Sequence, residues 1–226
     1  MFEPISGIVT IDGPAGVGKS TISRRVASRL GFTYLDTGAM YRAVAWYLKE
    51  NKIDISNIGE IESALMRISL ELLPAKHEDD DVGVLLNGKD ISSLIRTPEM
   101  SMLASSVSAL SPVREKLTAM QREAGENGNI VAEGRDTGTV VFPNALYKFF
   151  LDASPAARTA RRARQLKERG ETVDERKLLE MTIARDKQDR ERAIAPLRKA
   201  DDATLVDTTD LSVDQVLETV VKTIRG

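Results

Sequence analysis

The sequence contains no cysteine and only one histidine, His77. Without cysteine the chain cannot form a disulfide, a thiolate nucleophile or a cysteine-ligated zinc site, and one histidine cannot supply a histidine-cluster metal site. No histidine base is at hand for a Ser-His-Asp set. Any catalysis must therefore rely on other groups.

Aromatic residues and net charge are also scarce. Aromatics make up 4% of the 226 residues, so few side chains could stack on single-stranded nucleic acid. The 32 Lys and Arg against 34 Asp and Glu give −2, which lacks the field of a protein that coats nucleic acid. No apolar run approaches the roughly 20 residues that cross a bilayer, and Met1–Pro4 carry no basic signal-peptide start. We expect a cytoplasmic protein with no membrane or nucleic-acid partner.

Apolar residues are plentiful, at 42%, and their spacing predicts alternating strands and helices. Ile8–Asp12 is a β-rich run that leads through a Gly/Pro loop into apolar positions at helical spacing, Ile22, Val26 and Leu30. The other predicted elements of this alternation are strands Phe32–Leu35, Ile130–Glu133, Lys148–Asp152 and Thr204–Asp207 and helices Met40–Leu48, Val113–Glu123 and Val213–Ile224. We therefore predict an α/β fold whose central parallel sheet has about five strands flanked by helices.

Two segments depart from this alternation. Residues 51–110 contain apparent strands Ile68–Leu73 and Val82–Leu86 and the hairpin turn Asn87-Gly88, which predicts a small antiparallel insertion. Pro155–Lys199 is a long charged helical stretch, punctuated by Gly170 and stopped near Pro196. We expect a core of residues 1–50 and 111–226, with the insertion between them.

The loop after the first strand carries a phosphate-binding motif. Its residues match GxxxxGK[ST], in the strand-to-helix context that the motif requires: Gly13, Pro14, Ala15, Gly16, Val17, Gly18, Lys19 and Ser20. Glycines let backbone N–H groups turn toward phosphate oxygens, and the helix N-terminus adds positive charge. Lys19 would reach the β and γ phosphates, and Ser20 would offer its hydroxyl to Mg²⁺. The motif predicts binding of a nucleoside triphosphate.

A second string, Asn51-Lys52-Ile53-Asp54, matches the guanine-reading NKxD of GTPases. That loop should follow a late strand of the sheet, whereas Asn51 falls at the end of the second predicted helix. Its position argues against a GTPase.

Positive charge is concentrated in the second half of the chain. Residues 158–199 carry 14 basic and 8 acidic residues, or +6. Arg185, Asp189 and Arg192 share one helix face, and Arg135 with Asp136 directly follows an apolar strand, where open α/β sheets bind ligands. Arginine holds phosphate oxygens through planar, bidentate donors. Since a phosphate acceptor needs charge neutralisation and no base, this pattern favours a phosphorylated acceptor over an alcohol.

Taken together, ITIDGPAGVGKST, LDTGAMYR, VAEGRDTGTVVFP, FLDAS and RDKQDRERAIAP resemble the bacterial cytidylate kinase (CMP kinase) family of P-loop nucleoside monophosphate kinases. The resemblance covers essentially the whole chain. It implies a P-loop kinase fold in which residues 51–110 bind the monophosphate and a helical lid lies within about residues 155–192. It also implies Mg²⁺-dependent transfer of the ATP γ-phosphate to CMP or dCMP, by a monomer.

The resemblance also assigns roles to individual residues. Residues 13 to 21, ending at Thr21, would hold the ATP phosphates. The acceptor phosphate would be bound by Thr37, Arg42, Arg135 and Arg192, with Tyr41 beside them. The cytosine would be read by Ser105, Arg114 and Asp136, and the sugar hydroxyls would meet Arg185 and Asp189. The lid over ATP would carry Arg158, Arg161 and Arg162. Catalysis would fall to Lys19, Arg135, Arg185 and Arg192, and the metal to Ser20.

This chain departs from the family pattern at two positions and leaves one assignment open. Thr37 stands where the pattern LDSG has Ser, and it keeps the hydroxyl. Glu133 stands where ADGRD has Asp, which shifts the carboxylate outward by one methylene and bears on any role in orienting Mg²⁺. In the insertion, either Ser105 or Ser106 could meet the base.

Two other functions stay open on the residues alone. One is a kinase of a different acceptor, either another nucleoside monophosphate or a small metabolite. The other is a nucleotide-dependent switch that binds RNA through its arginine-rich arm, although the charge of −2 and the few aromatics count against it.

Overall fold

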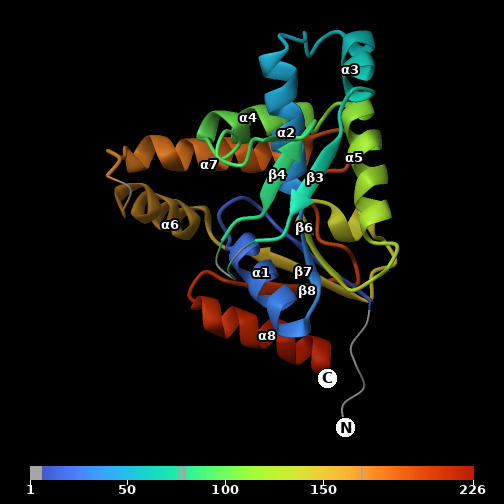
Figure 1. Ribbon diagram of the computed structural model, residues 1–226. Helices are drawn as coiled ribbons and strands as arrows, with labels where there is room; N and C mark the ends of the chain where they lie inside the picture. The colour runs from blue at the N-terminus through green and yellow to red at the C-terminus, as the bar shows by residue number, and fades with distance from the viewer. Residues whose placement is uncertain (1–6, 76, 78–79, 169) are drawn as a thin grey trace.

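The computed structural model describes residues 7–75, 77, 80–168 and 170–226. Met1–Pro4, on which the expectation of no signal peptide rested, lies outside the described residues. Two sheets and their covering helices make up this part of the chain (Figure 1). No helix in it has both the length and the apolar character needed to cross a membrane.

The larger sheet confirms the predicted parallel architecture. Its strand order is β2-β6-β1-β7-β8, and every neighbouring pair is parallel. The strands are β1 (Ile8–Asp12), β2 (Thr33–Asp36), β6 (Ile130–Gly134), β7 (Tyr147–Asp152) and β8 (Thr204–Asp207). Because all five run the same way, their carboxyl ends lie along one edge, where loops can meet a ligand.

Helices cover both faces of this sheet, which explains the continuous apolar strands. On β6, Ile130 and Ala132 pack into one core cluster and Val131 into the other, because alternate side chains point to opposite faces. The Val131 face is covered by α1 (Lys19–Leu30) and α8 (Val213–Arg225), and the opposite face by α2 (Thr37–Glu50) and α5 (Ser111–Ala124) (Figure 1).

The small sheet lies in the predicted insertion. It is antiparallel, in the order β3 (Leu70–Leu73), β4 (Gly83–Leu86) and β5 (Lys89–Asp90). Asn87 and Gly88 join β4 to β5 with φ of 49° and 78°, which confirms the predicted hairpin turn.

Two helices in this region were not predicted. They are α3 (Ile58–Leu65) and α4 (Pro98–Val107). Local signals for both were present, since Asn57 and Thr97 cap them through their side chains and Pro98 is the first residue of α4.

The charged helical stretch folds into two packed helices, α6 (Pro155–Glu168) and α7 (Glu175–Glu191), which project from the sheet (Figure 1). The break at Gly170 agrees with the prediction, but α7 ends at Glu191, well before Lys199. Pro196 excludes helix from the residue before it, and Ala195 has a φ of 49°. The chain turns back there, so that the Leu197 N–H donates to the Asp189 carbonyl at 2.8 Å.

The string Asn51-Lys52-Ile53-Asp54 begins at the end of a helix, as expected from its place in the sequence. Asn51 ends α2, and its side-chain amide donates to the Tyr47 carbonyl at 2.8 Å. It is thus part of a helix end, away from the carboxyl edge of the sheet.

Candidate active site

The phosphate loop joins β1 to α1 and depends on its glycines. Gly13 has a φ of 149°, and a Cβ there would lie 2.1 Å from the Leu151 carbonyl oxygen of β7. Gly16 and Gly18 have φ of 81° and 95°, which side chains disfavour. The Lys19 ammonium curls back and donates to the Pro14 carbonyl at 2.7 Å. The loop therefore surrounds a buried cation at a helix N-terminus, an arrangement suited to phosphate.

The buried Lys19 ammonium is only partly compensated by its neighbours. Burial, together with nearby Arg135, lowers the pKa of its ammonium to about 7 against the opposing effects of Glu133 and Asp12. A bound polyphosphate would supply the missing negative charge.

Glu133 and Ser20 form the part of the site suited to a metal ion. One Glu133 carboxylate oxygen accepts from the Tyr34 hydroxyl at 2.5 Å, and the other is buried without a hydrogen-bond partner among the residues that the structure describes. Within the described residues no cluster of three or more acidic or histidine side chains could hold a metal by itself. These residues fit Mg²⁺, which takes one or two protein oxygens and completes its shell with phosphates and water.

Asp12 connects the phosphate loop to a second loop. Its carboxylate accepts from the Thr137 N–H at 2.9 Å, the Thr137 hydroxyl at 2.8 Å and the Gly138 N–H at 2.7 Å. Thr137 begins a short π-helical turn, η1 (Thr137–Val141), directly after Asp136. Burial raises the pKa of Asp12 to about 6, although the hydrogen bonds from Gly138 and Thr137 oppose the shift.

Asp36 and Thr37 connect β2 to α2 and to the insertion. The Asp36 carboxylate caps α2 at the Ala39 N–H, 2.8 Å away, and accepts from Arg42 and Arg96, each at 3.2 Å. Burial acts to raise the pKa of Asp36, but Arg42 and Arg96 outweigh it and hold that pKa below its ordinary value. The Thr37 hydroxyl donates to the Glu133 carbonyl at 2.6 Å.

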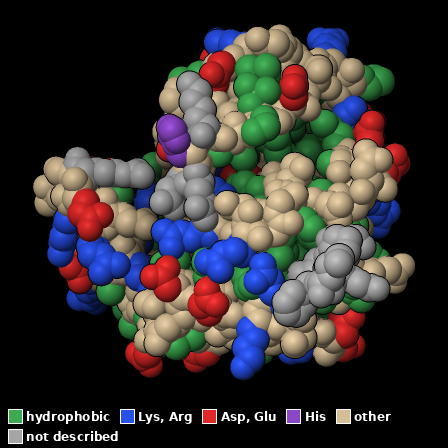
Figure 2. Space-filling view, turned by 60° about the horizontal axis from the view of Figure 1, so that its bottom comes forward, with side chains coloured by type: hydrophobic (Ala, Val, Ile, Leu, Met, Phe, Trp, Pro, Cys, Tyr) green, Lys and Arg blue, Asp and Glu red, His purple; other side chains and the backbone are tan. Residues whose placement is uncertain are grey.

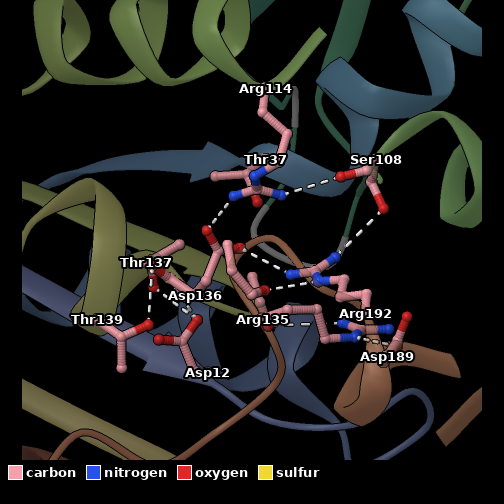
Figure 3. A network of polar contacts seen from close by, with 12 residues as sticks. Asp12, Thr37, Ser108, Arg114, Arg135, Asp136, Thr137, Thr139, Asp189 and Arg192 are labelled. Carbon is pink, nitrogen blue, oxygen red and sulfur yellow. Dashed lines mark hydrogen bonds and ion pairs between the residues drawn. The ribbon is translucent and has the colours of Figure 1, made fainter. Parts of the chain in front are cut away.

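Asp136 lies between two buried arginines (Figure 3). Arg114 of α5 donates to one of its carboxylate oxygens, and Arg192 donates to the other at 3.3 Å. Both guanidinium groups also contact Ser108, each at 3.2 Å. Arg114 in addition lies over the Tyr41 ring, 5.8 Å from its centroid. The carboxylate is thus fixed in direction yet keeps lone pairs for a further donor.

A neighbouring cluster gathers around Asp189. Its carboxylate accepts from Arg135 at 2.8 Å and from the Ser105 hydroxyl at 3.2 Å. Arg185, one turn earlier on α7, has a buried Nε without a partner in the described part of the chain, as does Arg42. Burial, together with nearby Arg135, lowers the pKa of Arg185 to about 10. Unpaired, desolvated N–H donors of this kind are suited to an anion.

The three arginines expected in the lid have unequal surroundings. Arg158 is 2% exposed and pairs with Asp186 of α7, and it donates to the Ala15 carbonyl of the phosphate loop at 3.0 Å. Arg161 is occupied by backbone oxygens of Thr208 and Thr209. Among the described residues, Arg162 donates a hydrogen bond only to Gln165, at 3.5 Å. Their roles toward ATP stay predictions.

The structure brings most of the predicted site residues together at the carboxyl edge of the sheet and the adjoining α4, α5 and α7. Sequence reasoning missed Asp12, Tyr34, Arg96 and Ser108, and placed Asp36 at a ligand-binding strand end without giving it a role. Asp12 ends one predicted strand and Asp36 directly follows another, which was a usable signal, whereas nothing local marked Arg96 or Ser108. His77 is exposed on the surface (Figure 2).

A parallel sheet with a phosphate loop after its central strand, facing a cluster of arginines, defines a P-loop kinase. The family model described as "Cytidylate kinase" matches residues 9–226, and the chain belongs to that family.

Curated relatives agree. The chain is 45% identical over 216 residues to "Cytidylate kinase" of Carboxydothermus hydrogenoformans, covering 96% of each chain. It is also 47% identical over 219 residues to "Bifunctional pantoate ligase/cytidylate kinase" of Prochlorococcus marinus. That match covers 96% of this chain but only 42% of the relative, so the chain spans less than half of the bifunctional protein.

Among solved structures, an uncharacterized protein from Eubacterium ventriosum is similar with a TM-score of 0.52 and 14% identity, covering 98% of both chains. This similarity concerns the fold alone.

Proposed function

We propose that the chain transfers the γ-phosphate of ATP to CMP or dCMP, giving ADP and CDP or dCDP. The observation that carries the proposal is Asp136, a carboxylate fixed by Arg114 and Arg192 beside arginines with unpaired donors. A carboxylate accepts from the exocyclic amine of cytosine, where uracil has an oxygen that cannot donate. The arginines would donate charge-assisted hydrogen bonds to the phosphate of the same acceptor.

On the donor side, the loop of residues 13–21 would bind the triphosphate. Its N–H groups and the N-terminus of α1 face the phosphates, and Lys19 would exchange its bond to Pro14 for phosphate oxygens. Mg²⁺, when bound, would neutralise developing charge, and Ser20 and Glu133 would hold it.

On the acceptor side, Thr37, Arg42, Arg135 and Arg192 would bind the monophosphate. One of its oxygens attacks the γ-phosphorus in line, the bond to the β-phosphate oxygen breaks, and ADP leaves with the electron pair. Because that oxygen is already anionic, no base has to remove a proton. Arginines that bridge donor and acceptor stabilise the charge on the transferring group.

The sugar and base would complete the acceptor site. Arg185 and Asp189 would meet the sugar hydroxyls, and Ser105 with Arg114 and Asp136 would contact cytosine, with Tyr41 packed beneath. Ser105 rather than Ser106 is favoured, because Ser105 is buried and bonded to Asp189.

The larger organisation is part of the proposal. Residues 51–110 would form the monophosphate-binding insertion, and α6 with α7 would form a lid, carrying Arg158, Arg161 and Arg162, that closes over ATP and excludes water. A monomer, a cytoplasmic location and the absence of a nucleic-acid partner stay predictions.

A substrate panel tests the proposal. ADP release from Mg-ATP is measured with CMP, dCMP, UMP, AMP, GMP or no acceptor, and we expect rapid turnover with CMP and dCMP. Lys19→Ala and Arg192→Ala should each abolish turnover while the protein stays folded, and the exposed Arg198→Ala is the matched control. Turnover with another acceptor alone would instead identify a kinase of that compound.

A further inference from the structure

Tyr34 and Glu133 lie on neighbouring strands and on the same face of the large sheet. In the parallel pairing of β2 with β6, Tyr34 is opposite Val131, and Glu133 is two residues further along β6. Residues two apart on a strand point to the same side, which is the side that α1 covers. The tyrosine therefore reaches diagonally across the sheet to Glu133, whose carboxyl also lies near the Ser20 hydroxyl at the start of α1.

The hydrogen bond between Tyr34 and Glu133 involves only one of the two carboxylate oxygens of Glu133. The Tyr34 hydroxyl donates to one oxygen at 2.5 Å, which fixes the rotation of the carboxylate. The other oxygen is buried, in a residue that is 4% exposed, and accepts no hydrogen bond of ordinary geometry from the described residues, although the nearby Ser20 hydroxyl acts to lower the pKa of this carboxyl. A buried carboxylate oxygen without a well-formed hydrogen bond is costly, so this oxygen, beside Ser20, is placed to accept a further group such as a cation or its water.

Side-chain length matters to this arrangement. An aspartate at position 133 would withdraw the carboxylate by one carbon, or about 1.5 Å. It could not keep the Tyr34 bond and the present place of the second oxygen at once. The long side chain and the tyrosine hydroxyl thus act as a pair, in which the hydroxyl holds the end of a flexible glutamate.

We propose that Tyr34 is a positioning residue for the magnesium site: its hydroxyl holds Glu133 so that the second carboxylate oxygen faces the Mg²⁺ of a bound nucleotide or a water in that ion's shell. This inference rests on the proposed function for the presence of Mg-nucleotide beside Ser20. Tyr34 itself would touch neither the metal nor the substrates.

The test measures ADP binding by calorimetry, with excess Mg²⁺ and with EDTA, in the wild type and in Tyr34→Phe. Phenylalanine keeps the ring packing and removes only the hydroxyl. We expect equal affinity in EDTA and an affinity about tenfold weaker with Mg²⁺, since removing the partner of a metal-binding side chain typically costs 10–100-fold. The Mg²⁺ concentration that gives half of the metal-dependent increase in ADP affinity should rise by a similar factor.

Two further variants make the result specific. Tyr47→Phe is the matched control, because Tyr47 is likewise a partly buried tyrosine packed against the core and lies on α2, outside the site. In a Glu133→Gln background, Tyr34→Phe should change Mg²⁺ dependence by less than about twofold, because the carboxylate that it positions has been removed. Thermal unfolding of each variant confirms that it is folded.

Unchanged Mg²⁺ dependence in Tyr34→Phe would overturn the inference. So would an equal loss of ADP affinity with and without metal, which would assign Tyr34 a packing role only. Because the assay contains no CMP and no turnover, these outcomes are distinct from failure of the proposed function, which the substrate panel detects separately.

Discussion

Asp12 and Gly138 are 126 positions apart in the sequence, yet the Gly138 N–H donates to the Asp12 carboxylate at 2.7 Å. Asp12 precedes the phosphate loop, and Gly138 follows the loop that carries Arg135 and Asp136. With the two bonds from Thr137, this contact fixes the phosphate loop relative to the loop that carries Arg135 and Asp136, the proposed donor and acceptor sites. In-line transfer depends on that relative position.

Asp12→Asn should therefore impair the reaction more than the fold. The amide has one acceptor oxygen and turns its NH₂ toward a backbone donor, so the loop with Asp136 must shift. A displacement of about 1 Å can cost about 100-fold in rate, and we expect kcat/KM for CMP to fall by roughly that factor. Steady-state kinetics measures the fall, and Thr137→Val, which keeps both backbone bonds, should be far milder. An Asp12→Asn enzyme with normal kinetics would show that the two loops are held in some other way.

The Asp12 carboxylate should also make the free energy of unfolding depend on pH. Its pKa is about 6 in the folded protein against an ordinary 3.8. Between those values the folded state binds more protons than the unfolded state, so raising the pH through this window lowers stability. We expect Asp12→Asn to gain up to about 3 kcal/mol relative to the wild type between pH 4 and pH 7. Urea unfolding across that range checks it, and a constant difference would contradict the raised pKa.

Nucleotide binding should take up a proton at Lys19. With a pKa of about 7, the ammonium is mostly neutral in the free protein at pH 8. Bound phosphates favour the charged form and raise that pKa, so binding draws a proton from the buffer. We expect an uptake approaching one proton per ATP at pH 8 and almost none at pH 6. Calorimetry in two buffers of different ionisation enthalpy measures it. Lys19→Met should remove the difference; an uptake that persists would place the titration elsewhere.

Asp136 should control the choice of base. Asp136→Asn should lower the ratio of kcat/KM for CMP over UMP by about tenfold or more, because an amide can donate to uracil as well as accept from cytosine. Asparagine is preferable to alanine, which would leave Arg114 and Arg192 buried, side by side and without a counter-charge. A substrate panel on the folded variant measures the ratio. An unchanged ratio would show that the base is read by other residues.

Arg158 should matter to stability as well as to nucleotide binding. It and Asp186 are 2% and 3% exposed and form a two-bonded pair between α6 and α7. Breaking such a pair from one side typically costs about 3–5 kcal/mol, so Asp186→Ala should destabilise the protein by that amount. Arg162→Ala, at a more exposed position on α6, should change stability by less than about 0.5 kcal/mol. Urea unfolding compares them, and equal effects would contradict the structural role of the pair.

Much of the fold follows from local sequence signals. The apolar runs Ile8–Asp12 and Ile130–Glu133, and the glycines of the phosphate loop, are dictated by patterns that act over a few residues. The same holds for the Asn87-Gly88 turn. Such signals predict which elements form and which loop binds phosphate, because hydrophobic periodicity and turn geometry are short-range properties.

Contacts between distant residues required the tertiary structure. That Arg114 and Arg192 meet on Asp136, that Arg96 reaches Asp36, and that Asp12 holds Gly138 all depend on strand order and on how α5 and α7 pack. The end of α7 at Glu191 likewise depended on a turn that brings Arg192 into the site. Local sequence patterns are enough to specify the strands, the phosphate loop and the family. Which charges are buried together depends on the packing of the whole chain, because burial and pairing involve residues far apart in the sequence.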